Sequence, residues 1–369
     1  MIGRVLEGAW RATPPPLQAS PDDIADVTPL LTGSGAASLG WWRVSAVPDL
    51  AAAPEADRLH DAARLQAIGD AVNQRSIEQI AAILNAAGVT PLVFKGWAAA
   101  RHYAETWLRP YGDFDLLIAS SEYTAAQETL WRHSHAGKSN PVLSDYFVNC
   151  EPAARPHRVD LHRDFPVQYA TPIDTLFSRA LPITLPGGAS ILVPCPEDHL
   201  RIVCLHFWRH GGWRPLWLCD IAAMVETADA QFDWEKCLTS NEVTRNWIAV
   251  AIAAAHTLLN CRIDHLPAGL QQGAPAWIVD TILEEWRAPF AARTLAPRLA
   301  PTFSYLSGRI RSRWPNPVRA AFVSHRSPLC AVGRREQARR FALDEYVASL
   351  KLLHPWWWKN LPVRMRRNG

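Results

Sequence analysis

The chain has 369 residues, of which 49% are hydrophobic and 20% are charged, and its formal net charge is +3. These values are ordinary for a globular protein and exclude a disordered, collagen-like or low-complexity chain. The small net charge hides a division, because residues 1–286 hold 21 basic and 32 acidic side chains whereas residues 287–369 hold 17 and 3. We therefore expect one large or two smaller domains with an acidic body and a strongly basic C-terminal segment.

Cysteine usage and hydropathy bear on the compartment of the protein. The chain has 7 cysteines, an odd number, and no Cys-x-x-Cys pair. This pattern disfavours a disulfide framework and a thiolate zinc site. The N-terminus lacks the apolar core of a signal peptide, and the longest apolar stretch, residues 247–259, is too short to cross a bilayer. We expect a cytoplasmic protein.

The first elements are helical. Residues 1–20 include Pro14, Pro15 and Pro16 and predict an irregular lead-in, which a helix over residues 21–33 follows. Residues 55–87 predict one or two helices that end at Gly88. Their apolar positions recur at helical spacing: Leu59, Ala63, Ile68, Val72, Ile77, Ile80 and Leu84.

From residue 89 the periodicity changes to that of short strands, which alternate with helices. Helices are expected over residues 97–105 and 121–133, and Pro186-Gly187-Gly188 predicts a hairpin turn. The expected strands cover residues 89–94, 113–118, 146–149, 158–162, 181–185 and 191–193.

After Pro196 the helical period returns, and a basic end follows it. Helices are expected over residues 197–209, 217–228, 234–238 and 244–259, with one amphipathic helix over residues 334–353. We divide the chain into a lead-in with helices (1–87), a strand-rich core (88–195), a helical domain (196–288) and a basic, Pro- and Arg-rich tail (289–369).

Two acidic residues, Asp113 and Asp115, carry the strongest chemical signal. They stand two apart on an expected strand, so both side chains point to the same face, where two carboxylates repel unless a cation lies between them. Carboxylate oxygens are ligands that Mg²⁺ prefers, with a substrate phosphate supplying the remainder. Asp160, in a second apolar strand, is the candidate third carboxylate, and His162 shares its face as a candidate neighbour of the metals.

Upstream residues suggest contacts to phosphate. Lys95-Gly96 closes a strand ahead of a helix, where a glycine lets phosphate approach the backbone N–H groups. Arg109 precedes Asp113 by four residues and is expected to reach a phosphate.

These motifs together resemble a known family. Phe94-Lys95-Gly96, the stretch Arg109-Pro110-Tyr111-Gly112-Asp113-Phe114-Asp115 and Val159-Asp160-Leu161-His162 resemble the uncharacterised bacterial nucleotidyltransferases of the DNA polymerase β superfamily. Downstream, Cys195-Pro-Glu-Asp-His199, Cys204-Leu-His206 and Cys219-Asp220-Ile-Ala222 are similar to the helical region of that family. The resemblance covers roughly residues 55–262.

The resemblance implies an α+β fold with a small mixed β-sheet as the nucleotidyltransferase core and helical segments on both sides. It implies two Mg²⁺ ions on Asp113, Asp115 and Asp160, and a nucleoside triphosphate as substrate. Lys95 and Arg109 would offset charge on the leaving phosphates. The acceptor stays open, with a peptide natural product or a small molecule as the favoured guess.

Other readings of the sequence stay open beside the enzyme. In the wider superfamily a hydroxyl-bearing or second small residue follows the glycine, where this chain has Trp97. A catalytically inactive nucleotide- or partner-binding protein is therefore one alternative. His199, His206 and His210 share one helix face, which is compatible with a metal site, with a cleft lining or with a structural role.

The basic end allows three interpretations. Trp356-Trp357-Trp358 lies beside Lys359 and several arginines, a mixture suited to a nucleic acid or an anionic membrane surface. The same segment is also suited to fold over the acidic body as an internal electrostatic partner, which is the favoured interpretation of the three. A nucleic-acid or membrane-surface module is therefore the second alternative function.

Overall fold

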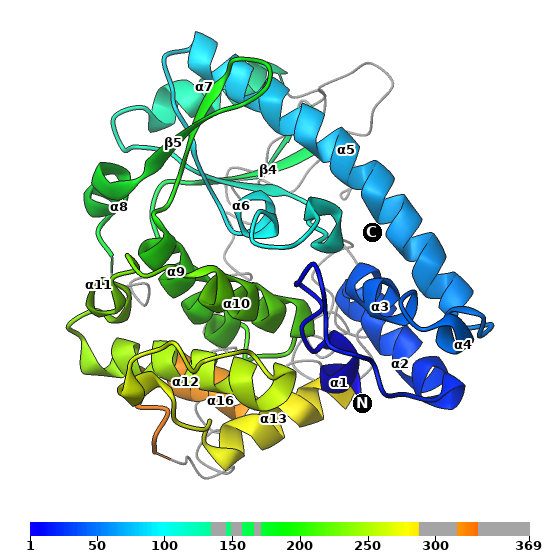
Figure 1. Ribbon diagram of the computed structural model, residues 1–369. Helices are drawn as coiled ribbons and strands as arrows, with labels where there is room; N and C mark the ends of the chain where they lie inside the picture. The colour runs from blue at the N-terminus through cyan, green and yellow to red at the C-terminus, as the bar shows by residue number, and fades with distance from the viewer. Residues whose placement is uncertain (134–144, 149–156, 166–170, 288–315, 331–369) are drawn as a thin grey trace, which may run out of the picture.

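The computed structural model describes residues 1–133, 145–148, 157–165, 171–287 and 316–330, and Figure 1 shows their arrangement. Helices surround a six-stranded mixed sheet, which confirms the expected α+β class. In Figure 1 the sheet with α5 and α7 forms the upper part, and helices α9 to α13 form the lower part. None of the helices in the described ranges is long and apolar enough to span a membrane.

The N-terminal region is more ordered than the prolines suggested. Residues 1–20, expected as an irregular lead-in, contain helix α1 (Ile2–Leu6), whose apolar side chains are buried. Helix α2 (Pro21–Ser34) begins at a capping box between Ser20 and Asp23 and ends at Gly35, whose φ of 77° suits glycine. Helices α3 (Ala37–Val44) and α4 (Pro48–Ala51) lead into α5.

Helix α5 (Ala56–Ala86) is one continuous helix of 31 residues. Its first part contributes Leu59 to the hydrophobic cluster of the helical region, and its last part contributes Ile77 and Ile80 to the cluster beneath the sheet. The apolar stripe expected from the sequence is interrupted between these two parts, because Ile68 and Val72 are exposed. The helix therefore spans two cores and belongs to both.

The sheet has the strand order β3-β4-β2-β1-β6-β5. Its strands are β1 (Leu92–Phe94), β2 (Phe114–Leu117), β3 (Asp145–Val148), β4 (His157–His162), β5 (Leu181–Thr184) and β6 (Ser190–Val193). Helices α6 (Gly96–Ala100), α7 (Tyr123–His133) and α8 (Ile173–Arg179) and the 3₁₀ turn η1 (Thr106–Leu108) connect them. The helix expected over residues 97–105 is thus confined to the short α6.

Strand register decides which face of the sheet carries the polar residues. β2 runs parallel to β4, and Asp115 pairs with Asp160. Phe114, Leu116 and Val159, which point to the opposite face, pack with α5 and α7 in one hydrophobic cluster. Alternation along the strands therefore directs Asp115 and Asp160 to the face away from α5 and α7.

The helical region covers that polar face. It comprises α9 (Pro196–Arg209), α10 (Pro215–Thr227), α11 (Trp234–Leu238), α12 (Glu242–Leu259), η3 (Ala268–Leu270), α13 (Ala276–Arg287) and α16 (Pro317–Val323). These helices share one hydrophobic cluster with α1, α2 and α3. Its largest fully buried side chains are Trp208, Trp247 and Trp286, as expected for tryptophans that anchor a core.

The predicted domain boundaries remain predictions, but two observations bear on them. The N-terminal helices and the helical region form one cluster, and α16 joins it from inside the segment assigned to the basic tail. The amphipathic helix expected over residues 334–353 and the aromatic and basic residues after it lie outside the described residues.

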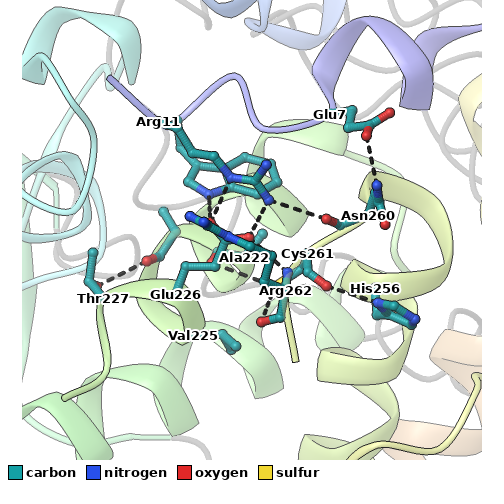
Figure 2. A network of polar contacts seen from close by, with 12 residues as sticks. Glu7, Arg11, Ala222, Val225, Glu226, Thr227, His256, Asn260, Cys261 and Arg262 are labelled. Atoms are coloured by element: carbon teal, nitrogen blue, oxygen red, sulfur yellow. Dashed lines mark hydrogen bonds and ion pairs between the residues drawn. The ribbon is translucent and has the colours of Figure 1, made fainter. Parts of the chain in front are cut away.

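Glu226, near the end of α10, fastens the N-terminal segment to the helical region (Figure 2). Its carboxylate accepts hydrogen bonds from Arg11 at 2.6 and 2.7 Å, and from the Trp10 indole at 3.1 Å. The backbone N–H of Arg262 donates to the same carboxylate at 2.8 Å. Burial alone would raise the pKa of Glu226, but these hydrogen bonds, Arg11 first among them, hold it below its ordinary value.

Replacement of Glu226 tests this attachment. Glu226→Ala leaves the partly buried Arg11 guanidinium and the Trp10 N–H without an acceptor, so we expect a loss of about 3–5 kcal/mol in unfolding free energy. Urea denaturation measures the difference. Glu55→Ala, which removes the exposed i,i+3 ion pair with Arg58, is the control and should change stability by less than about 0.5 kcal/mol.

Candidate active site

The carboxylates expected to hold metal lie on adjacent strands. Asp115 in β2 and Asp160 in β4 are register partners, and Asp113 lies immediately before β2 rather than within it. Three potential ligand atoms lie within 4.8 Å of one another: a carboxylate oxygen of Asp115, one of Asp160 and a ring nitrogen of His162. Asp113 is not part of that group, but its pKa is raised by burial and then by the charges of Asp115 and Asp160. The fold therefore gathers the three expected acids and His162 into one region.

Two nitrogen-bearing side chains, Lys95 and His162, contact Asp115. The Lys95 ammonium donates to Asp115 Oδ1 at 2.7 Å, and His162 Nε2 lies 3.1 Å from the same oxygen. Burial alone would raise the pKa of Asp115, but the charge of Lys95 and the hydrogen bond with His162 lower it to about 2. His162 Nε2 also lies 3.4 Å from Asp160 Oδ2. Burial opposes its positive charge, but the hydrogen bonds to Asp115 and Asp160 raise the pKa of His162 above its ordinary value.

Arg158 is a further positively charged residue of the site, and it was not among the residues expected there from the sequence. It stands two residues before Asp160 on β4, so both side chains point to the same face of the sheet. Its charge lowers the pKa of Asp113 against the effect of burial. The signal was present in the alternation Arg158-Val159-Asp160-Leu161-His162, which places charged or polar residues at every second position with apolar residues between them.

Lys95 has an unusual backbone conformation. Its φ of 54° and ψ of −132° lie in a region that side-chain-bearing residues rarely adopt, and such conformations persist only where the surroundings enforce them. Its backbone N–H donates to His199 Nε2 at 3.2 Å, so this nitrogen of His199 is the acceptor. His199 is 3% exposed, and burial lowers its pKa to about 3.

Gly96 has a packing function in the structure. A Cβ at this position would lie 3.2 Å from the Cβ of Tyr111 and 3.6 Å from the carbonyl oxygen of Asp113. The glycine therefore lets the segment before β2 lie directly against the start of α6. Tyr111 occupies the side of Gly96 where a side chain would be, and the approach of a phosphate to the backbone N–H groups stays a prediction.

Arg109, expected to reach a phosphate, is held in the structure by a buried ion pair with Asp220. Its guanidinium forms two hydrogen bonds with the carboxylate of Asp220 on α10, at 3.0 and 2.7 Å, and donates to the carbonyl of Pro110 at 3.0 Å. The hydroxyl of Tyr103 donates to the same carboxylate at 2.7 Å. All three side chains are buried. Arg109 thus holds the segment that leads into β2 against helix α10.

Sequence reasoning missed the positioning role of Asp220. Its partner Arg109 is 111 residues away, so no local spacing reveals the pair. A signal was nevertheless available, because Asp220 interrupts the apolar helix Pro215–Thr227, and a carboxylate buried in such a helix needs a partner.

The histidines of α9 take different roles from one another. His199 supports the backbone of Lys95, whereas His206 and His210 lie against each other and against Trp217, with ring centroids 4.6 to 4.9 Å apart. Across the described residues, the one group of three potential metal ligands is that of Asp115, Asp160 and His162. The zinc interpretation of the α9 histidines therefore has no support from the described residues, and packing with Trp217 accounts for His206 and His210.

The match to a protein-family model agrees with the resemblance seen in the sequence motifs. A family model described as "Uncharacterised nucleotidyltransferase" matches residues 21–260. The crystal structure of an antigenic nucleotidyltransferase-like protein from Paracoccidioides brasiliensis is similar at 17% identity and a TM-score of 0.37, over 56% of this chain and 95% of that one. None of the curated protein sequences matches the chain significantly.

Loss of the buried counter-charge at Asp220 should destabilise the fold. Asp220→Asn leaves the Arg109 guanidinium buried without a carboxylate, so we expect the unfolding free energy to fall by about 3–5 kcal/mol. Asp264→Asn, at an exposed position, is the control and should stay within about 0.5 kcal/mol of the wild type. Chemical denaturation compares the three proteins, and equal losses for both variants would contradict the assignment.

The buried imidazole of His199 should make stability depend on pH. Its pKa is about 3 in the folded chain and about 6.5 when unfolded, so its contribution is complete above pH 6.5 and is lost as pH falls towards 3. His199→Gln keeps an acceptor for the Lys95 N–H but does not titrate. We expect the slope of unfolding free energy against pH between pH 6 and 4 to fall by about 1.4 kcal/mol per pH unit. Denaturation at a series of pH values measures it.

Proposed function

This chain belongs to the family of uncharacterised nucleotidyltransferases, and we propose that it transfers a nucleotidyl group from a nucleoside triphosphate to an acceptor at the site of Asp113, Asp115 and Asp160. The observation that carries the proposal is the pairing of Asp115 with Asp160 on neighbouring parallel strands. This pairing places two carboxylates side by side on the face that the helical region covers.

The donor set fits a divalent cation. Asp115 and Asp160 each offer a carboxylate oxygen, and these two oxygens and a ring nitrogen of His162 all lie within 4.8 Å of one another. Asp113 adds a third carboxylate nearby. Oxygen donors suit Mg²⁺, which is bound through a few carboxylates together with substrate phosphates. We propose Mg²⁺, in the two-ion form that the family resemblance implies. The ions would supply positive charge at the attacking and leaving oxygens of the reaction.

The residues of the chain have distinct parts in the proposed reaction. The acceptor oxygen attacks the α-phosphorus, the bond to the bridging oxygen of the β-phosphate breaks, and pyrophosphate leaves. Asp160 takes the proton of the acceptor hydroxyl, because its side chain is 27% exposed and that of Asp115 only 11%, so Asp160 is the more accessible carboxylate. Lys95 and Arg158 bring positive charge to the side of the phosphates.

Arg109 has a positioning role in this proposal. Its guanidinium is occupied by Asp220 and by the carbonyl of Pro110, so it holds the segment before Asp113 instead of meeting a phosphate. His162 shares a face with Asp160 and bridges it to Asp115, which suits it to orient these carboxylates.

The inactive alternative has its own motivating observation. Trp97 stands where the wider superfamily has a small or hydroxyl-bearing residue, and its indole N–H donates to Gln74 at 2.8 Å inside the core. The chain therefore lacks a side-chain hydroxyl for phosphate at this position. A protein that binds nucleotide without transferring it would keep Mg²⁺-dependent nucleotide binding and show no release of pyrophosphate.

The test follows pyrophosphate release and label transfer with Mg²⁺, each labelled nucleoside triphosphate and a set of acceptors. We expect Asp115→Asn and Asp160→Asn to lower the rate by about 10²–10³, because each removes an anionic ligand of the proposed cations, whose charge would stabilise the reacting phosphates. Asp174→Asn, at an exposed position in α8, is the matched control and should react as the wild type does. Unchanged Mg²⁺-dependent nucleotide binding and transfer in Asp115→Asn would contradict the proposed site.

A further inference from the structure

Asp115 Oδ1 has two nitrogen partners before any ligand arrives. Lys95 Nζ lies 2.7 Å from this oxygen and His162 Nε2 lies 3.1 Å from it. A carboxylate oxygen offers about two lone-pair positions, so both positions on Oδ1 have a nitrogen partner. A divalent cation that uses this oxygen must displace one of the two groups.

Several contacts direct the Lys95 side chain toward Asp115. The backbone is held at a φ of 54° by the hydrogen bond from its N–H to His199 and by the close packing of the next residue, Gly96, against Tyr111. The ammonium also lies 4.7 Å from the ring centroid of Phe94, where it gains a cation–π contact. The direction of the side chain is thus set by buried neighbours, and Asp115 is the carboxylate it meets.

The lysine and a divalent cation are electrostatic competitors at this carboxylate. Mg²⁺ binds oxygen at about 2.0–2.1 Å, so an ion on Asp115 and the Lys95 ammonium would be close neighbours with like charge. The side chains of Lys95 and Asp115 are only 14% and 11% exposed, so water screens this repulsion poorly. The ion therefore binds weakly as long as the ammonium stays on Asp115.

A triphosphate can remove the competitor. The lysine stem is flexible and its ammonium binds any oxyanion as a point charge, so phosphate oxygens beside Asp115 can take the ammonium over. We propose that Lys95 is an internal counter-cation that competes with the divalent cation for Asp115, and that nucleoside triphosphate relieves the competition by drawing the ammonium onto its phosphates. This inference rests on the proposed nucleotidyl transfer. Its consequence is that the ion enters together with the nucleotide.

The test measures Mn²⁺ binding by electron paramagnetic resonance in the absence of nucleotide, with the wild type, Lys95→Met and Lys95→Arg. Methionine keeps the apolar stem against Phe94 and removes the charge, whereas arginine keeps the charge. We expect Lys95→Met to bind Mn²⁺ about tenfold more tightly than the wild type, the size of effect that one neighbouring charge has on an ionic equilibrium. Lys95→Arg should bind as weakly as the wild type.

A second arm repeats the titration with a non-hydrolysable nucleoside triphosphate. The analogue should tighten Mn²⁺ binding more in the wild type than in Lys95→Met, because only the wild type has a competitor to lose. Lys95→Gln serves as a second uncharged variant, and circular dichroism checks that each variant is folded. Mn²⁺ affinity in Lys95→Met and Lys95→Gln equal to or weaker than that of the wild type overturns the proposal.

Asp115→Asn separates the failure of this inference from the failure of the proposed function. If Asp115→Asn loses Mn²⁺ while the uncharged Lys95 variants do not gain it, the metal site stands and the competition is wrong. If Asp115→Asn binds Mn²⁺ as the wild type does, Asp115 is not a ligand, and both the proposed metal site and the competition fall.

Discussion

The buried carboxylate of Asp220 is the constraint on which the arrangement of the site depends. It sits in an apolar helix, where an unpaired charge is strongly unfavourable, so it needs the guanidinium of Arg109 and the hydroxyl of Tyr103. Both partners come from the segment between α6 and β2. This one interaction therefore connects the helical region to the residues that lead into Asp113 and Asp115.

The polar face of the sheet follows from a simple alternation. In β2 and β4 every second residue is apolar and packs on α5 and α7, so the acids and His162 must appear on the other face. That face lies beneath the helical region, where the Lys95 ammonium and the His162 ring both contact Asp115. These contacts to Asp115 offset part of the repulsion among carboxylates that lie together in a largely buried site.

Much of the fold and of the candidate site could be predicted from the sequence because it depends on residues that are close together in the chain. The strand periodicity predicted Phe114 in the core and Asp115 on the opposite face. Gly88 predicted the end of α5 to within two residues of Ala86, where the helix ends. Helix α1 was missed although Ile2, Val5 and Leu6 have helical spacing, because the three prolines after it dominated the reading of residues 1–20. What could not be predicted is non-local or conformational. The partner of Arg109 lies 111 residues away, and the positive φ of Lys95 is enforced by surroundings that no short motif encodes.

Helix α10 carries two buried carboxylates that serve different parts of the chain. Asp220 holds the segment before β2, and Glu226 holds Arg11 and Trp10 near the N-terminus. The sheet region therefore depends on the rest of the chain, since Leu92, Phe94 and Leu117 belong to the hydrophobic cluster of the helical region and Arg109 would be buried without its counter-ion. A fragment that keeps both of these attachments must extend from the first residues of the chain to beyond α10.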